Sequence, residues 1–305
     1  MLILDCRKEF IKRCLALNLE ETTINQYEKV LKRFISFCNE KEIKEIDKVD
    51  ASLLRDHIYG LSKTMQPISI KIHYMALKVF FNFLKNNEKI SNNPILKVET
   101  PKISKKIIPA FSNNEIRTIL NCFNKDEFLG YRNYTLTCIL FGTGIRRSEL
   151  VNLLIDDIYF ELDIINILGK GDKQRHVPLT QTLKKIIIRY LEKRLEYVKE
   201  HKLISCRYLI ISNRGQKLNI ATVNDIYARI AENEHIKGVR VSPHTWRHTF
   251  AKNALLNGMD LFTLGRILGH SSIEVTKKYI NLNDNEIKIQ NDRFNPFENQ
   301  KWRYF

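Results

Sequence analysis

The sequence predicts a mainly α-helical protein with a small β-sheet, arranged as an N-terminal helical bundle and a mixed α/β domain. Apolar residues recur at helical spacing through most of the 305 residues, and this length is enough for two ordinary domains. One pair of strand-like runs, 163–168 and 174–179, is separated by a glycine-containing stretch that is typical of a β-hairpin. The chain is 44% hydrophobic, so it can bury a core and is not globally disordered.

The first domain, residues 1–97, is expected to be a bundle of four helices, because short connections separate its helical patterns. Thr23 and Gln26 offer a capping box at the start of the second helix. The expected helices cover about 5–18, 23–38, 50–62 and 67–88. The fourth carries an apolar stripe, with lysines between its members, that consists of Ile68, Ile72, Met75, Val79 and Phe83.

Residues 98–110 are expected to link the two domains, because they combine two prolines and several lysines with no periodic apolar stripe. The second domain, residues 111–305, begins with a capping box formed by Ser112 and Glu115. Besides the hairpin, helices are expected at about 112–123, 128–141, 146–155, 181–200, 219–234, 242–258, 260–268 and 272–283.

Positive charge is concentrated in one part of the chain. The formal net charge is +16, and residues 63–106 hold nine lysines against only Glu88 and Glu99, whereas residues 1–62 are balanced. A charge run is often a solvated face, but an excess in one helix and the segment after it favours a polyanion-binding surface. The candidate nucleic-acid contacts on this helix are Lys71, Lys78 and Lys85.

Several classes of protein are excluded by composition. The six cysteines are scattered without a CxxC pair, which favours reduced thiols in a cytoplasmic protein over a disulfide scaffold or a zinc ribbon. No run reaches the roughly 18 apolar residues of a membrane span. The chain start lacks the apolar region of a signal peptide. We therefore expect a cytoplasmic protein without a membrane partner.

Four separated motifs carry cationic or proton-transferring groups, and a tyrosine follows the last of them. Each motif alone is weak evidence, and His244 with His248 makes no metal site without further ligands. Together, two arginines, two histidines and a lysine around one tyrosine suit a phosphodiester transition state, in which cations neutralise the oxygens and the tyrosine attacks without a metal. The groups are Arg146 and Glu149 in GTGIRRSEL, Lys170 in GKG, His244 and Arg247 in SPHTWRH, His270 in LGH, and Tyr279.

These motifs resemble those of the tyrosine recombinases of the phage-integrase/Xer family. GTGIRRSEL, GKGDKQRHVPL and SPHTWRHTFA stand in the family's order and spacing, and the resemblance is strong from Ser112 to about Asn283. It implies a SAM-like core-binding bundle followed by a catalytic domain, which together close around duplex DNA. One departure is Arg147, where the family usually has a hydrophobic residue; it adds a charge that can contact DNA.

The resemblance also implies roles for the motif residues. Arg146 and Arg247 would clamp the scissile phosphate, His270 would bond a non-bridging oxygen, and Glu149 would brace the site. His244 would assist proton transfer near the nucleophile. Lys170 would be the general acid, and Tyr279 would form a 3′-phosphotyrosyl link. No metal, ATP or other cofactor is implied.

The implied partner is double-stranded DNA that carries paired recombination sites. Four protomers, identical or mixed with a related recombinase, would assemble there, and the tail, about 284–305, would dock on a neighbour. Arg147, Lys173 and Arg175 join the three lysines of the fourth helix as candidate DNA contacts.

Two other functions stay open at this point: a type IB topoisomerase, which would relax DNA with nearly the same residues, and a non-catalytic DNA-binding relative. Within the recombinases, one sequence does not separate a chromosome-dimer resolvase from the integrase of a phage or mobile element. Nor does it specify the DNA target.

Overall fold

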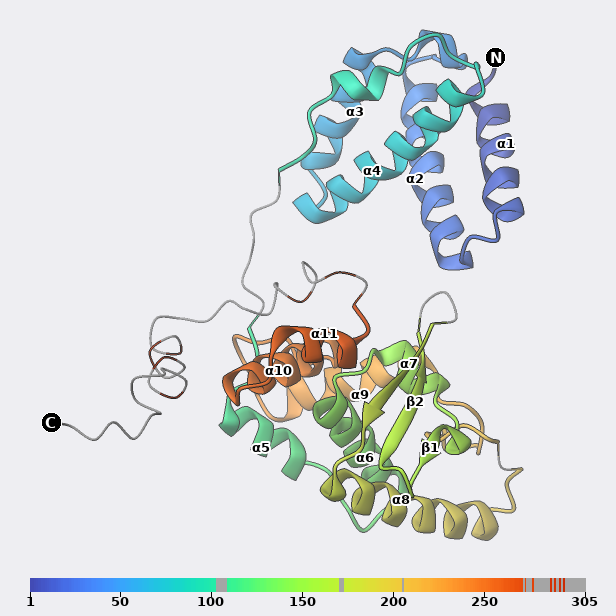
Figure 1. Cartoon of the computed structure of the whole chain (residues 1–305). Helices are drawn as coiled ribbons and strands as arrows, with labels where there is room; N and C mark the ends of the chain where they lie inside the picture. Colours follow the sequence, from blue (N-terminus) through green and yellow to red (C-terminus); the bar gives the residue numbers. More distant parts are fainter. Residues whose placement is uncertain are drawn as a thin grey trace, which may run out of the picture. The chain divides into compact units, whose positions relative to one another are not determined.

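The computed structural model describes residues 1–102, 109–169, 173–204 and 206–270, together with Ser272, Thr276, Glu286, Lys288, Asn291 and Arg293. The chain divides into two compact units, Met1–Lys106 and Ile107–Phe305 (Figure 1). Both are mainly helical, and the second holds a three-stranded sheet. The predicted fold class is therefore confirmed. The boundary between the units falls inside the segment 98–110 that the sequence indicates as a linker.

The first unit is a helical bundle around an aromatic core. Its described elements are α1 (Ile3–Ala16), α2 (Glu21–Glu40), η1 (Ile46–Lys48), α3 (Ala51–Ser62), α4 (Pro67–Asn86) and η2 (Pro94–Lys97). Phe10, Phe34, Phe80 and Phe81 are fully buried, and the ring of Phe10 meets that of Phe80 edge to face at 5.5 Å. Burial of rings this large dominates the packing of so small a bundle.

The start of α2 differs from the prediction. The helix begins at Glu21 after the N-cap residue Glu20, which makes no side-chain capping bond. The backbone N–H of Thr23 already donates to the Glu20 carbonyl, so Thr23 lies inside the first turn. A residue inside the turn does not cap it. The predicted Thr23–Gln26 capping box is therefore wrong.

The apolar stripe assigned to α4 is also wrong in orientation. Ile68, Ile72, Met75 and Val79 are 55%, 40%, 47% and 36% exposed, and only Phe83 of the predicted set is buried. The core face is the opposite one, formed by Ile70, Tyr74, Leu77, Phe81 and Leu84. The helix is apolar on two faces, so periodicity alone did not indicate which face packs.

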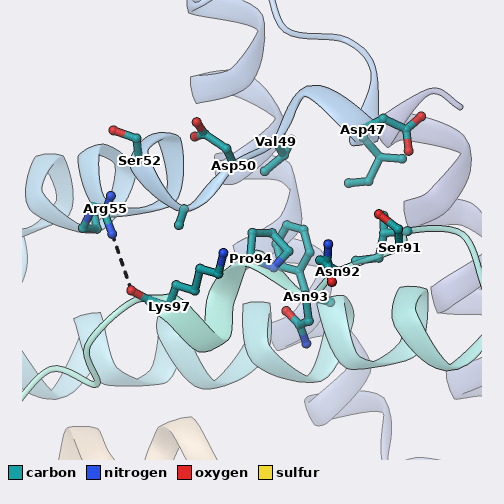
Figure 2. A pocket seen from close by; sticks show the side chains of 14 residues that line it. Asp47, Val49, Asp50, Ser52, Arg55, Ser91, Asn92, Asn93, Pro94 and Lys97 are labelled. Atoms are coloured by element: carbon teal, nitrogen blue, oxygen red, sulfur yellow. Dashed lines mark hydrogen bonds between the residues drawn. The ribbon is translucent and has the colours of Figure 1, made fainter.

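A hollow of about 430 Å³ lies on the first unit, between η1, the start of α3 and η2 (Figure 2). Its lining mixes Asp47 and Asp50 with Arg55 and Lys97. Both carboxylates have partners, because Asp50 caps α3 through Leu53 and Asp47 pairs with the N-terminal amine. Mixed charge does not favour a polyanion, so this hollow is no candidate for nucleic acid.

The second unit packs helices around α6 (Phe128–Thr143), which contacts both α8 (Gln181–Glu200) and α10 (Pro243–Leu256). Its other described helices are α5 (Asn113–Asn121), α7 (Arg147–Asn152), η3 (Ile155–Asp157), α9 (Ile220–Asn233) and α11 (Leu261–Leu268). Trp246, Tyr190 and Tyr227 are the largest side chains fully buried in its core. The capping box at Ser112 is confirmed, since Glu115 and Ser112 cap each other's backbone N–H.

The sheet of the second unit is antiparallel, in the order β1 (Ile158–Tyr159), β2 (Ile164–Leu168), β3 (Gln174–Pro178). Ile165 pairs with Val177, and both side chains are buried in the core below the hairpin. The predicted hairpin is confirmed, and β1 is an addition that the sequence pattern did not indicate. In the part of the chain that the structure describes, no helix combines the length and the apolar character needed to cross a membrane.

Candidate active site

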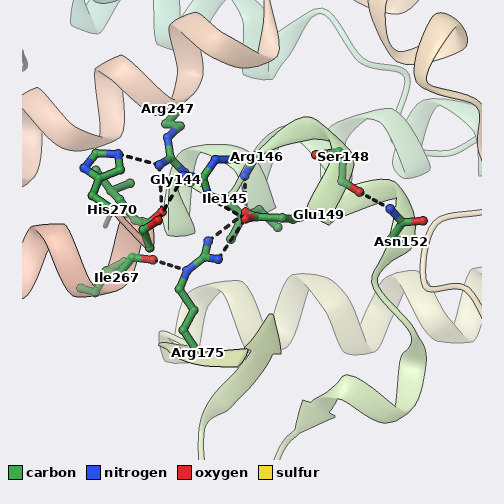
Figure 3. Close-up of polar contacts among 12 residues, drawn as sticks. Gly144, Ile145, Arg146, Ser148, Glu149, Asn152, Arg175, Arg247, Ile267 and His270 are labelled. Carbon is green, nitrogen blue, oxygen red and sulfur yellow. Dashed lines mark hydrogen bonds and ion pairs between the residues drawn. The ribbon is translucent and has the colours of Figure 1, made fainter. Parts of the chain in front are cut away.

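Three element ends meet at the candidate site: the end of α6, the start of α10 and the end of α11 (Figure 3). Gly144 ends α6 with φ 63°, and a Cβ there would lie 2.3 Å from the Phe250 ring. Glycine is therefore required for this turn. Gly269 ends α11 in the same left-handed conformation. At α10, Ser242 caps the helix and Pro243 follows it, as the sequence predicts.

Arg247 is fixed by the carbonyl groups of two of these ends. Its guanidinium donates to Gly144 O at 2.7 Å and to Leu268 O at 2.8 Å, although only 4% of the residue is exposed. Carbonyls at helix C-termini lack partners inside their own helix and carry partial negative charge, so they stabilise a guanidinium there. The motif residue Arg247 is thus preorganised before any ligand binds.

Glu149 holds two further arginines. Its carboxylate accepts two hydrogen bonds from Arg175, at 2.9 and 2.8 Å, one from the Arg146 guanidinium at 2.8 Å and one from the Arg146 backbone N–H at 2.7 Å. Burial alone would raise the pKa of Glu149, but these bonds outweigh it and lower the pKa to about 2. The carboxylate is therefore ionised and fixes the Arg146 side chain, which stays 39% exposed.

His270 joins the arginine cluster to Thr276. The His270 Nε2 atom lies 2.8 Å from the Arg247 guanidinium, and its Nδ1 atom lies 2.8 Å from the hydroxyl of Thr276. Thr276 is fully buried. No motif pointed to this threonine; its position three residues before Tyr279 in the sequence was the available signal.

His244 and His248 face each other on α10, with their Nε2 atoms 3.2 Å apart. Burial lowers the pKa of His244, with help from Arg247 and Arg240. Burial also lowers the pKa of His248, to about 4, with the charges of His244 and Arg247 as further causes. Both rings are therefore neutral near pH 7, so His244 can accept a proton there.

Two hollows lined by cations share Arg146. The first, about 360 Å³, has Arg146, Arg147, Arg240, Arg247 and His244 in its lining. The second, about 810 Å³, has Arg146, Lys173, Arg175, Arg266 and His270. None of the described residues that line either hollow is acidic. Sequence reasoning missed Arg240 and Arg266, although each is a basic residue a few positions before a motif histidine.

The remaining predicted residues fall into three groups. Lys170 and Tyr279 lie outside the described residues. Lys173 is exposed, and its carbonyl accepts from the Gly169 N–H at 2.8 Å, which closes the hairpin. Lys71, Lys78 and Lys85 belong to α4 of the first unit, where Lys85 is exposed and the other two are half-buried.

Two of the candidate DNA contacts in the second unit already have partners within the chain. Arg147 donates to Asn224 and remains half-exposed in the first hollow. Arg175 donates to the Ile267 carbonyl and to Glu149, and its side chain is only 12% exposed. This geometry favours a bracing role for Arg175 over the predicted contact with DNA.

The helix expected at about 146–155 is shorter than predicted. The observed α7 covers six residues, Arg147–Asn152, because Leu153 turns to extended geometry. The cationic side chains that line the two hollows give this site a positive field. Within the described residues no cluster of three or more His, Cys, Asp or Glu side chains is placed to hold a metal ion.

The model of the phage integrase family matches residues 110–286, which is more than half of the chain. The chain belongs to the phage integrase family. The model of the family's N-terminal SAM-like domain matches residues 12–88, so the bundle and the site are both accounted for by integrase domains.

Relatives in the family cover nearly the whole length of the chain. A tyrosine recombinase XerD of Listeria monocytogenes is 29% identical over 91% of this chain and 94% of its own. One of Staphylococcus epidermidis is 27% identical over the same shares. Among solved structures, the XerH site-specific recombinase bound to palindromic difH substrate has a TM-score of 0.74 at 23% identity, covering 93% of this chain and 83% of its own. The Tn1549 transposon integrase, bound to a circular intermediate DNA, reaches 0.76 at 19% identity over 96% and 99%.

Proposed function

We propose that this member of the phage integrase family is a site-specific recombinase that cleaves and rejoins duplex DNA through a covalent 3′-phosphotyrosyl intermediate. One observation carries the proposal most directly: two hollows that share Arg146 are lined by arginine, lysine and histidine without a described acidic residue. A site of this kind stabilises a pentacoordinate phosphate, whose equatorial oxygens carry negative charge.

The described contacts support a separate role for each motif residue in the cleavage step. Arg146 and Arg247, fixed by Glu149 and by helix-end carbonyls, bind the two non-bridging oxygens. The Tyr279 oxygen attacks phosphorus and passes its proton to the neutral His244. The 5′ oxygen leaves and takes a proton from Lys170. The phosphodiester is exchanged for a phosphotyrosine ester of similar energy, so the reaction needs neither ATP nor a metal ion.

The first unit supplies a second DNA surface on α4. The helix has no acidic residue, and its lysines flank the exposed row formed by Ile68, Ile72, Met75 and Val79. Lysines suit phosphates, and exposed aliphatic side chains suit the methyl groups of thymine in the major groove. We infer that α4 lies in the major groove of each half-site.

The assembly follows from the chemistry of exchange. Joining two duplexes requires four cleaved strands, so the working form is a tetramer on two paired sites, formed by this chain alone or with a related recombinase. In its solved structure, the XerH site-specific recombinase is bound to a palindromic difH substrate. We place the reaction in the cytoplasm, because the six cysteines are free thiols and a reducing compartment that holds DNA suits them.

The test is covalent capture from a random pool. The protein is incubated with nicked duplexes of random sequence, and SDS-resistant adducts are isolated and sequenced. Wild type should yield adducts that share one sequence; Tyr279→Phe should bind DNA but yield none, and Tyr159→Phe is the matched control at an exposed tyrosine. Adducts without a shared sequence would indicate a topoisomerase, and binding without adducts a non-catalytic relative.

A further inference from the structure

Thr276 links the cation cluster to the segment that carries the proposed nucleophile. Its hydroxyl lies 2.8 Å from His270 Nδ1, and the residue has no exposed surface. A Cβ on Gly265 of α11 would lie only 3.1 Å from this hydroxyl, so α11 packs closely against it. Thr276 therefore occupies a fitted position three residues before Tyr279 in the sequence.

The hydrogen positions in this chain of contacts follow from the donor inventory. A guanidinium has only donors, so His270 Nε2 must accept the bond from Arg247. A neutral imidazole that accepts at Nε2 carries its proton on Nδ1. His270 Nδ1–H therefore donates to the Thr276 hydroxyl oxygen.

We propose that Thr276 is a positioning residue that holds His270 in its Nδ1–H form. The role in cleavage rests on the function proposed above. Both the neutral Nδ1–H imidazole and the imidazolium donate from Nδ1. The bond to Thr276 is therefore kept when Nε2 takes up a proton from solvent and donates to a phosphate oxygen instead of accepting from the guanidinium. The ring keeps its orientation during the change of partner.

Loss of the hydroxyl should slow cleavage through two effects. A buried Nδ1–H without an acceptor is costly, so the ring would change tautomer or turn. A ring that turns would also misplace its bond to the phosphate, and misplacement by about 1 Å can cost about a hundredfold in rate. We expect a decrease of roughly 10- to 100-fold in the rate of adduct formation.

The kinetic experiment compares Thr276→Val, which keeps the shape but lacks the hydroxyl, with Thr276→Ser, which keeps the hydroxyl. Adduct formation is followed in single turnover from pH 5 to 9 on a duplex recovered in the capture experiment. Thr276→Val should be slow with an altered pH profile and unchanged DNA affinity, and Thr276→Ser should regain most of the rate. The matched control is Thr135→Val, which removes an equally buried hydroxyl of α6 remote from the motif residues. Equal rates and profiles for wild type and Thr276→Val, or equal slowing in Thr276→Ser, would overturn the proposal.

A spectroscopic measurement decides the tautomer without any reaction. In protein with ¹⁵N-labelled histidine, the His270 signals are assigned as those missing from His270→Gln. They should report a protonated Nδ1 in wild type and in Thr276→Ser, and a different state in Thr276→Val. A protonated Nε2 with a bare Nδ1 in neutral wild-type protein would refute the positioning role, even if the protein formed no adduct and the proposed function failed.

Discussion

Glu149 is the residue that connects the hairpin to the N-terminus of α7 at the candidate site. It accepts from Arg146 on one side and from Arg175 of β3 on the other, with 4% of its side chain exposed. A buried carboxylate with this many donors is ionised at every pH in normal use, since its pKa is about 2. Replacing Glu149 should destabilise the fold, because Arg146 and Arg175 would keep their charges without this carboxylate.

We expect Glu149→Gln to lower the free energy of unfolding by about 3 kcal/mol at pH 7, because it breaks a buried ion pair. The pKa of Glu149 falls from 4.5 in the unfolded chain to about 2 in the fold, so its contribution is complete above pH 4.5 and disappears as the pH falls toward 2. Urea unfolding of wild type and Glu149→Gln at pH 7, 4.5 and 3 measures the difference in the free energy of unfolding. Asp156→Asn, in the exposed pair with Arg207, should change little at any pH. If the loss in free energy of unfolding for Glu149→Gln stays constant down to pH 3, the lowered pKa of Glu149 is contradicted.

The general acid is the second test at this scale, since Lys170 lies outside the described residues and Lys173 stands exposed at the other end of the loop. Lys170→Ala should slow cleavage by about 10²–10⁴ and recover on a substrate with a 5′-bridging phosphorothiolate, because sulfur leaves without a proton. Lys173→Ala is the matched comparison. If only Lys173→Ala is rescued by sulfur, Lys173 is the acid.

The sequence indicated the arginines and histidines of the site because their motifs carry fixed spacing around glycines. It did not indicate Thr276, whose role depends on a contact with His270 and on the packing of α11, neither of which has a local pattern. Arg175, a basic residue on the hairpin, was predicted to contact DNA. Its orientation toward Glu149 depends on tertiary packing that spacing does not encode.

Among the helices, α4 shows that apolar periodicity alone does not identify the face that packs in the core. Both of its faces are apolar, and the face with Tyr74, Phe81 and Leu84 packs in the core. An apolar row left exposed beside lysines is unusual for a soluble surface and points to a partner. Helix ends, in contrast, were predicted well at Ser112, Ser242 and Gly269, because capping is decided by residues within one turn.

The exposed row on α4 should make binding sensitive to thymine methyl groups. Each buried methyl is worth about 0.8 kcal/mol, so two of them give roughly a tenfold difference. Wild type should therefore bind poly(dA-dT) more tightly than poly(dA-dU) in fluorescence anisotropy. Ile72→Ser with Met75→Ser should remove the difference and keep the salt dependence, while Leu15→Ser on α1 should preserve both. Equal binding of the two polymers by wild type would exclude thymine reading by this face.

In the whole molecule, the tail is the segment that is predicted to couple neighbouring protomers. Of the tail, about 284–305, only Glu286, Lys288, Asn291 and Arg293 are described, so docking in trans remains a prediction. Glu286 pairs with Lys252 of its own chain at 2.7 Å, which fixes the start of the tail on α10. Coupling of neighbours would therefore have to act through the residues beyond this pair.

Truncation after Asp284 should leave the fold and single-site binding nearly intact but abolish tetrameric synapsis and strand exchange. The expected reason is loss of the segment that reports assembly to the Tyr279 region. Native gel shift and a two-site recombination assay measure the two activities. Lys252→Met, which removes only the ion pair with Glu286, is the matched control and should recombine nearly as wild type. Full recombination by the truncated chain would show that the tail takes no part in coupling.

Mass spectrometry of the captured adduct can show whether Tyr279 becomes joined to a 3′ phosphate. After digestion with trypsin and nuclease, the account predicts that the peptide YINLNDNEIK, residues 279–288, carries a nucleotide through a phosphotyrosine bond. The matching cleaved DNA end should carry a free 5′-hydroxyl. A nucleotide on any other peptide, or a 5′-phosphate linkage to this one, would contradict the account.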